Sequence, residues 1–230
     1  MLKVFERTAA LQPIGVSALA REIGADKSAV QRDLMTLADA GWIRPATGAG
    51  TGQWELTPHV LTLARPPHSS GSLRQRARLA LERLRSDTGE TAYLTVPHGD
   101  QFVVLDAQES RHMLRMVPPV GMVVPVRGSA TARAILPYLP ESEQARLLGE
   151  PLSDGMRGEF AATRSRGYAL NDGDIEPSAV ALASAILDRQ GQPVGALVLT
   201  GPAERLDRAR RDEIGQKLYR EAQATSEIQG

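Results

Sequence analysis

Four hydrogen-bonding side chains lie close together in the N-terminal third of the sequence. They are Lys27, Ser28, Gln31 and Arg32, and they follow Asp26, a residue type that begins helices by accepting backbone N–H groups. On a helix, positions i, i+1, i+4 and i+5 fall on neighbouring parts of the first two turns. Glutamine can pair with adenine and arginine with guanine through two hydrogen bonds each, while lysine attracts phosphate. The spacing therefore predicts a surface that recognises double-stranded DNA.

Two short amphipathic helices are expected to position these side chains. The first spans residues 16–23 and stops at Gly24, because glycine readily adopts the left-handed conformation that ends helices. The second starts after Asp26 and stops at Gly41, and its apolar residues fall at i, i+4, i+7 and i+8. These apolar residues are Val30, Leu34, Leu37 and Ala38. Helices joined by so short a turn cross steeply, which predicts a helix-turn-helix.

A β-hairpin is predicted directly after the second helix. Residues 42–44 and 53–56 have the composition of strands, and the glycine-rich run 48–52 between them forms the tip. A hairpin in this place is a wing, which can lie along the phosphate backbone of DNA. Thr51 and Gln53 are the phosphate contacts that we expect from it.

Two more helices should complete this domain. A short helix is expected to begin at Thr57 and Pro58, because threonine caps helices and proline is tolerated at their first position. Another helix is predicted over residues 1–11 and supports the helix-turn-helix. The side chains that we expect it to turn toward the core are Leu2, Phe5 and Ala9. Residues 1–65 are thus predicted to form a winged helix-turn-helix DNA-binding domain.

Composition limits the class of protein. The chain has 230 residues, of which 42% are apolar and 23% charged, as in ordinary globular proteins with room for two modest domains. It has 27 basic and 27 acidic residues, so any attraction to nucleic acid must come from local clusters. The absence of cysteine excludes disulfides and thiolate metal sites. No apolar run approaches the length of a membrane span, so we expect a cytoplasmic protein without a membrane partner.

A linker and an arginine-rich helix follow the first domain, over residues 66–88. Residues 65–72 have a linker's composition, and the spacing after them predicts a helix over residues 73–85. Its apolar stripe could pack on its own domain or against a second subunit, and we favour the second subunit. Its arginines could be solvated or could face DNA phosphates. The stripe consists of Leu73, Ala77, Leu81 and Leu84.

The remaining residues, 89–230, alternate between strand and helix patterns. This pattern predicts an antiparallel sheet with helices beside it, an α+β domain of the ligand-sensing type. The predicted strands span residues 91–96, 101–105, 113–117, 181–188 and 194–200, and the predicted helices span residues 129–138, 141–148 and 159–166, with a long one from residue 204.

Several segments give the chain a resemblance to the IclR family of transcriptional regulators. The N-terminal part has LAREIG followed by DKSAVQRDLMTLADAGWI. The C-terminal part has PVGMVVPVRGSATARAIL, RGYALNDGD and ALASAILDRQGQPVGALVLTGP, in the family's order and spacing. The resemblance implies a winged helix-turn-helix joined by a linker helix to a GAF-like effector domain. It also implies a homodimer, or a dimer of dimers, on a palindromic operator.

The resemblance also suggests where a small-molecule effector would bind. Relatives that bind small organic acids tend to have a carboxylate, a cysteine and two serines at positions that look equivalent here to Asn171, Ala181, Val198 and Thr200. Two of these four are apolar in this chain, which disfavours a small, highly charged acid.

Backbone N–H groups could nevertheless hold an acid. Those of Ala130 and Thr131 are expected at the start of a helix, where unpaired donors favour an anion. We therefore expect an aromatic or aliphatic acid with its oxygen at these amides and an apolar body against Ala181 and Val198. The alternative is a vestigial pocket in a domain that only oligomerises.

An enzymatic C-terminal domain is a further alternative. The four histidines are scattered without metal-ligand spacing, and the sequence has no nucleophile elbow or phosphate-binding glycine loop. A small acidic group near the expected pocket could be catalytic but more often forms a solvated loop. That group consists of Asp172, Asp174 and Glu176. We therefore expect a regulator without catalytic residues, metal or cofactor.

Overall fold

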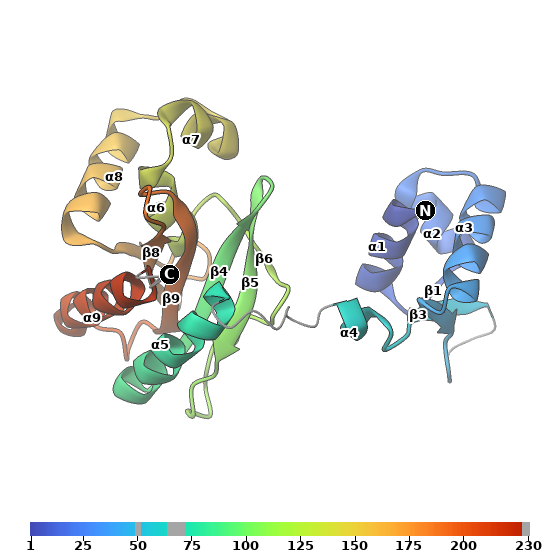
Figure 1. Cartoon of the computed structure of the whole chain (residues 1–230), viewed down its shortest axis with the longest axis horizontal. Coiled ribbons are helices and arrows are strands. Elements are labelled where there is room, and N and C mark those ends of the chain that lie inside the picture. The colour runs from blue at the N-terminus through green and yellow to red at the C-terminus, as the bar shows by residue number, and fades with distance from the viewer. Residues whose placement is uncertain (49–51, 64–71, 227–230) are drawn as a thin grey trace. The chain divides into compact units, whose positions relative to one another are not determined.

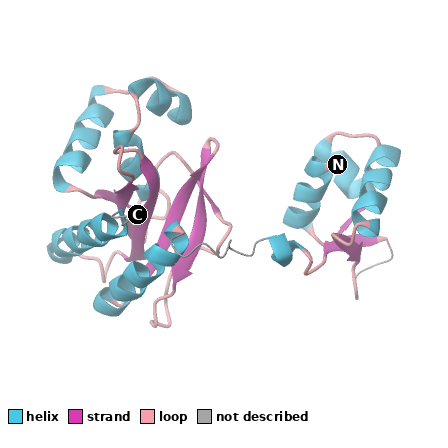
Figure 2. Ribbon diagram, in the orientation of Figure 1, coloured by secondary structure: helices cyan, strands magenta, loops and turns pink. Residues whose placement is uncertain are grey.

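The protein consists of two compact units. A computed structural model describes residues 1–48, 52–63 and 72–226. The chain divides into an N-terminal unit, Met1–Ser69, and a C-terminal unit, Ser70–Gly230. Figure 1 traces each unit along the chain, and Figure 2 shows that both combine helices with a sheet.

The N-terminal unit packs three helices beside a small antiparallel sheet of order β1-β3-β2. A fourth, one-turn helix follows the last strand. The helices are α1 (Leu2–Leu11), α2 (Val16–Ile23), α3 (Lys27–Asp39) and α4 (Val60–Leu63), and the strands are β1 (Ile14–Gly15), β2 (Ile43–Pro45) and β3 (Gln53–Leu56).

Local signals explain how α2 and α3 are joined. Gly24 ends α2 in a left-handed conformation with φ of 66°, and Asp26 begins α3 by accepting the N–H groups of Ser28 and Ala29. The apolar side of α3 lies in the core of the unit with Leu19 of α2. The predicted positions of α2, α3 and both hairpin strands are confirmed within one or two residues.

The predicted orientation of α1 is correct for Phe5, which packs against the core, and for Ala9, which is partly buried, but wrong for Leu2. Leu2 is 73% exposed, whereas Val4 and Thr8 are buried. Thr8 can lie in the core because its hydroxyl donates a hydrogen bond to the carbonyl oxygen of Val4, 2.8 Å away. Because this bond within the helix satisfies the hydroxyl, a polar side chain can be buried. The buried face of α1 therefore includes Val4 and Thr8 and not Leu2.

The C-terminal unit is built on one antiparallel sheet of order β6-β5-β4-β9-β8-β7. The longest strands, β8 and β9, lie next to each other toward one side of it. The strands are β4 (Thr91–His98), β5 (Gln101–Gln108), β6 (Val123–Val124), β7 (Ala169–Asp172), β8 (Ala179–Leu187) and β9 (Pro193–Pro202).

Helices cover both faces of this sheet and create two apolar cores. The helices α5 and α9 pack on one face, and α6, α7 and α8 pack on the other. Successive residues of a strand point to opposite faces, so neighbours such as Val180 and Ala181 belong to different cores. The helices are α5 (Leu73–Thr88), α6 (Ala130–Ile135), the 3-10 turn η1 (Leu136–Tyr138), α7 (Glu141–Leu148), α8 (Asp154–Arg166) and α9 (Arg208–Ser226).

The apolar stripe of α5 packs on its own unit, and our preference for a second subunit is wrong. Ala77, Leu81 and Leu84 are fully buried in the core shared with α9. Several of the helix's arginines have partners in the same unit: Arg74 pairs with Asp106 and Arg83 with Glu221. The helix assigned to the linker is therefore part of the C-terminal unit. Of the predicted linker, residues 65–71 lie outside the described residues, and Ser72 is the N-cap residue at which α5 begins.

The predicted strand at residues 113–117 is also wrong. That segment is a loop, and Met113 is 98% exposed. Pro118 and Pro119 lack N–H groups and therefore cannot continue a ladder of backbone hydrogen bonds. The edge of the sheet is formed instead by β6, while β7 at the other edge was not predicted.

Candidate functional site

The polar side chains predicted on the second helix lie together at the start of α3. Lys27, Ser28 and Arg32 are exposed, and Gln31 is half-buried. Within the described residues, the side chains of Lys27, Gln31 and Arg32 form no hydrogen bond or ion pair. Arg32 therefore has no pair with Asp33, whose carboxylate lies 2.7 Å from the backbone nitrogen of Met1. The donors of α3 are available to a partner molecule.

The hairpin after α3 is anchored to the rest of the N-terminal unit. Its strand β3 pairs with β2 on one side and with β1 on the other, where Trp54 lies opposite Ile14. The predicted contact Gln53 is half-buried, and its carbonyl oxygen accepts a hydrogen bond from the N–H of Ala46. Thr51, the other predicted contact, lies outside the described residues.

A cavity of about 300 Å³ opens in the C-terminal unit, on the face of the sheet that carries α6. Its floor includes residues of β4, β8 and β9, and residues 116–119 and 122 of the loop before β6 form an apolar wall. Four of the six predicted effector contacts line it, namely Ala130, Asn171, Ala181 and Thr200.

Thr131 and Val198 do not line the cavity. Thr131 is buried, and its hydroxyl lies 3.3 Å from that of Thr95. Val198 is fully buried beside Ala183 and Ala196 in the core behind α6. Val198 faces the expected side of the sheet, and Thr131 packs on that side from α6. Both lie deeper in the core than the cavity does.

Most polar side chains of the cavity are already hydrogen-bonded within the protein. The amide group of Asn171 donates to the carbonyl oxygen of Gly128 and accepts from the N–H of Asp174. The hydroxyl of Thr200 donates to the carbonyl oxygen of Val180 over 3.2 Å. These bonds hold the walls in place and leave fewer groups for a ligand.

Tyr93 lines the cavity and was missed by the sequence analysis. It lies on β4, only 9% of it is exposed, and burial raises the pKa of its phenol well above the ordinary value. Its hydroxyl has no hydrogen bond to another described residue, so a neutral donor remains for a ligand. The alternation of the predicted strand 91–96 could have revealed it, since Tyr93 shares a face with Thr91 and Thr95.

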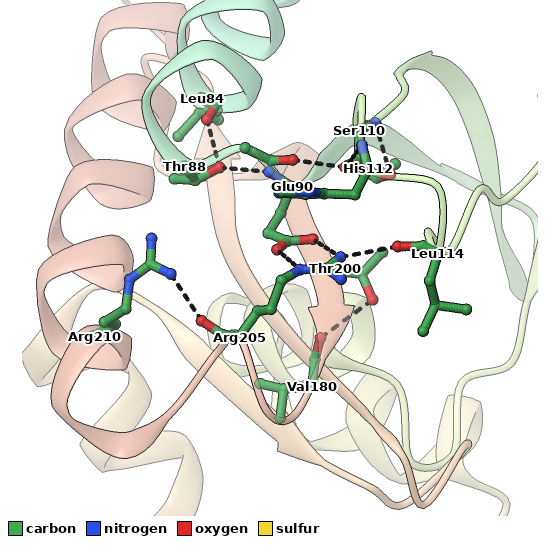
Figure 3. A network of polar contacts seen from close by, with 12 residues as sticks. Leu84, Thr88, Glu90, Ser110, His112, Leu114, Val180, Thr200, Arg205 and Arg210 are labelled. Atoms are coloured by element: carbon green, nitrogen blue, oxygen red, sulfur yellow. Dashed lines mark hydrogen bonds and ion pairs between the residues drawn. The ribbon is translucent and has the colours of Figure 1, made fainter.

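A buried ion pair lies at one end of the loop that walls the cavity (Figure 3). Glu90 is 1% exposed and receives two hydrogen bonds from Arg205, whose pKa the carboxylate raises. The same guanidinium donates to the carbonyl oxygen of Leu114 over 3.1 Å. The carboxylate of Glu90 packs directly against the backbone of β9 at Gly201, where an added Cβ would lie 2.5 Å from it. The pair thereby joins the loop to the segment between β9 and α9.

Ser110 connects the same loop to the end of α5 (Figure 3). Its hydroxyl donates to the carbonyl oxygen of Gly89 over 2.6 Å, and its N–H donates to the hydroxyl of Thr91. The loop is thus bonded at its start to the helix that enters the C-terminal unit.

The groups considered for catalysis have structural partners. Asp172 pairs with Arg211 and Asp174 with Arg133, and Glu176 accepts a hydrogen bond from the hydroxyl of Ser178. The ring of His59 packs on Trp42. The part of the chain that the structure describes contains no cluster of three potential metal ligands among histidine, aspartate and glutamate. It also contains no helix long and apolar enough to cross a membrane.

Comparison with known proteins relates the chain to bacterial regulators. It is 26% identical to the acetate operon repressor of Salmonella typhimurium and 25% identical to the transcriptional repressor IclR of Escherichia coli. Each of these matches covers 91% of this chain and 80% of the relative. The relatives are named as regulators and repressors, so the chain is a transcriptional regulator and not an enzyme.

Solved structures share its fold over nearly the whole chain. An IclR regulator from Silicibacter sp. TM1040 is 27% identical with a TM-score of 0.82, over 98% of this chain and 92% of that one. An IclR homologue from Microbacterium hydrocarbonoxydans, solved with 4-hydroxybenzoate, is 19% identical with a TM-score of 0.81, over 98% and 95%. The family profile described as bacterial transcriptional regulator IclR, C-terminal, matches residues 68–227. The chain therefore belongs to the IclR family of bacterial transcriptional regulators.

Proposed function

We propose that the N-terminal unit is a winged helix-turn-helix that binds an operator through α3. The observation that carries this proposal is the group of unbonded polar side chains at the start of a capped helix. In the major groove, Ser28, Gln31 and Arg32 would lie nearest to base edges and Lys27 nearest to phosphate. Thr51 and Gln53 of the hairpin would contact the phosphate backbone.

The operator would be palindromic and bound by a homodimer or by a dimer of dimers. A dimer places two copies of α3 in successive major grooves on one side of the DNA, which requires two related half-sites. Membership of the IclR family supports this arrangement.

A small-molecule effector would bind the cavity of the C-terminal unit and change operator affinity. Support comes from the size of the cavity, its apolar wall and the unbonded Tyr93 hydroxyl, together with a relative of the same fold solved with 4-hydroxybenzoate. We propose Ala130, Asn171, Ala181 and Thr200 as contacts, while Thr131 and Val198 would shape the site from behind. An aromatic or aliphatic acid is the effector expected from the sequence.

A fluorescence-polarisation titration tests the DNA part of this proposal. The full chain is titrated onto labelled DNA from upstream of its own gene and onto shuffled DNA of the same composition. We expect a palindromic segment to bind at least about 1,000-fold more tightly than the shuffled control, as specific regulators do. Equal affinities would contradict the proposal. Repeating the titration with small molecules tests the effector part, and affinity that no ligand changes would favour a C-terminal unit that only oligomerises.

A further inference from the structure

One large side chain on the exposed side of α3 is apolar. Met35 is 45% exposed, whereas the apolar residues Val30 and Leu34 of the same helix are buried in the core of the N-terminal unit. Isolated apolar side chains are common on protein surfaces, so the exposure of Met35 is informative only through its position. The other exposed side chains of α3 can all form hydrogen bonds, and they are Lys27, Ser28, Arg32, Thr36 and Asp39.

Met35 lies at the centre of the face of α3 that carries the four predicted DNA contacts. Successive residues of an α-helix are rotated by about 100° around its axis. Counted from Lys27, Gln31 lies at about 40°, Ser28 at about 100° and Arg32 at about 140°. Met35 lies at about 80°, one turn beyond Gln31 and Arg32. Any placement of α3 that brings these four side chains into a groove therefore brings Met35 toward the same groove.

A carboxylate limits this face at its far end. Asp39 lies one turn beyond Met35 and is exposed. It forms no hydrogen bond or ion pair with another residue that the structure describes. Because DNA phosphates repel a carboxylate, α3 should enter the groove with its N-terminal turns. The contacts with bases then end at Met35.

An apolar side chain in the major groove can recognise one feature of a base. Among the four unmodified bases, only thymine carries a methyl group there, and apolar side chains contact it. Such a contact removes apolar surface of both partners from water. We propose that Met35 contacts the methyl group of a thymine and selects a T·A pair at one position of each half-site. This proposal rests on the proposed operator binding and adds a base that the four polar contacts do not read.

Operators with deoxyuridine in place of single thymines test the proposal. Deoxyuridine keeps every hydrogen-bonding group of thymine and lacks only the methyl group. Each thymine on either strand of one half-site is replaced in turn, and the affinity of the full chain is measured by fluorescence polarisation. We expect one position at which binding by the wild type weakens by about fourfold, the effect of burying one methyl-sized group.

Variants show whether Met35 causes this dependence. Met35→Ala should bind the unmodified operator more weakly, and deoxyuridine at the identified position should weaken it no further. Alanine favours helices, so this exposed substitution should leave α3 folded. Met35→Leu keeps an apolar side chain and should retain the dependence. Leu61→Ala is the matched control, because Leu61 of α4 is also apolar and is 67% exposed, and it should discriminate like the wild type.

The outcomes separate this proposal from the function on which it rests. If the operator is bound specifically but no thymine position distinguishes the wild type from Met35→Ala, the thymine contact is overturned and the proposed function stands. An equal loss of affinity for operator and shuffled DNA in Met35→Ala would also overturn the contact. A wild type that prefers no DNA segment over the shuffled control would refute operator recognition itself, and the contact with it.

Discussion

The start of α3 and the cavity of the C-terminal unit both contain polar side chains, but they differ in whether those side chains are hydrogen-bonded within the protein. On α3, Lys27, Gln31 and Arg32 are available, since no other described residue bonds to their side chains. In the cavity, Asn171 and Thr200 are buried and hydrogen-bonded to backbone groups. Side chains of the first kind can contribute to binding without being needed for folding, whereas those of the second kind hold the fold together.

Because of this difference, we expect substitutions on α3 to change DNA binding without changing stability, and substitutions of bonded, buried side chains to change stability. The two units can be followed independently, because both tryptophans, Trp42 and Trp54, lie in the N-terminal unit. Tryptophan fluorescence therefore reports unfolding of that unit alone, while circular dichroism reports helix and strand content in both.

The largest effect is expected for Arg205→Met. Removing the guanidinium leaves the carboxylate of Glu90 buried without its partner, which should lower the free energy of unfolding by about 3–5 kcal/mol. Urea denaturation should show an earlier transition by circular dichroism, while the fluorescence transition of the N-terminal unit stays in place.

Two controls accompany this variant. Arg220→Met alters an exposed arginine of α9 and should leave both transitions unchanged. Adding Glu90→Gln to Arg205→Met removes the unpaired charge and should restore part of the lost stability. If Arg205→Met were as stable as the Arg220→Met control, the ion pair would not hold the unit together.

Arg32→Ala should produce the reverse pattern. Operator binding should weaken by about 1–3 kcal/mol and discriminate less between specific and shuffled DNA, because a base contact is lost. Neither unfolding transition should move, since Arg32 has no partner among the described residues. Equal losses on both DNAs, or a shifted fluorescence transition, would refute its assignment to a base.

Sequence reasoning succeeded where the determining contacts are local. Asp26 begins α3 by bonding to backbone groups two and three residues away, and Gly24 ends α2 through its own conformation. The apolar spacing of α3 then fixes which side chains remain outside. Lys27 and Arg32 could be placed on the surface for this reason.

The rest of the molecule depends on contacts between distant segments. The stripe of α5 looks the same whether it packs on α9 or on another subunit, and only the fold reveals α9 as its partner. The alternation of the strand 91–96 assigns Tyr93 to one face of the sheet, but the cavity on that face requires β4, β8 and β9 to lie side by side, which spacing did not reveal. Thr131 and Val198 were placed on the correct face, but their depth was not predictable.

A smaller effect is expected for Lys27→Ala. A lysine at phosphate attracts all DNA sequences alike, so specific and shuffled DNA should lose similar affinity. The slope of the logarithm of affinity against the logarithm of salt concentration should fall in magnitude by about 1. Measuring that slope for the wild type, Lys27→Ala and Arg32→Ala would show whether the two residues differ as proposed, and an unchanged slope for Lys27→Ala would remove it from the phosphate contacts.

The smallest effect is expected where a side chain is bonded but exposed, as in Asp172. Its carboxylate receives two hydrogen bonds from Arg211, which lower its pKa below the ordinary value, yet 48% of the side chain faces solvent. Because the folded protein holds the charged form more strongly, the contribution to stability is present at neutral pH and is lost as the pH falls below about 4.

Asp172→Asn should therefore cost less than about 1 kcal/mol at neutral pH, since solvent screens the exposed carboxylate. The Arg211 side chain is only 12% exposed, but it keeps its hydrogen bond to the carbonyl oxygen of Leu206 in this variant. The difference in unfolding free energy from the wild type, measured by urea denaturation, should shrink as the medium is acidified. Glu213→Gln, which alters an exposed glutamate of α9, serves as a control that should not change stability. A loss as large as that of Arg205→Met would show that bonding alone, without burial, makes a side chain essential to the fold. A loss confined to neutral pH and far smaller than that of Arg205→Met would identify burial of the carboxylate, which is 1% exposed in Glu90 and 48% exposed in Asp172, as the decisive difference.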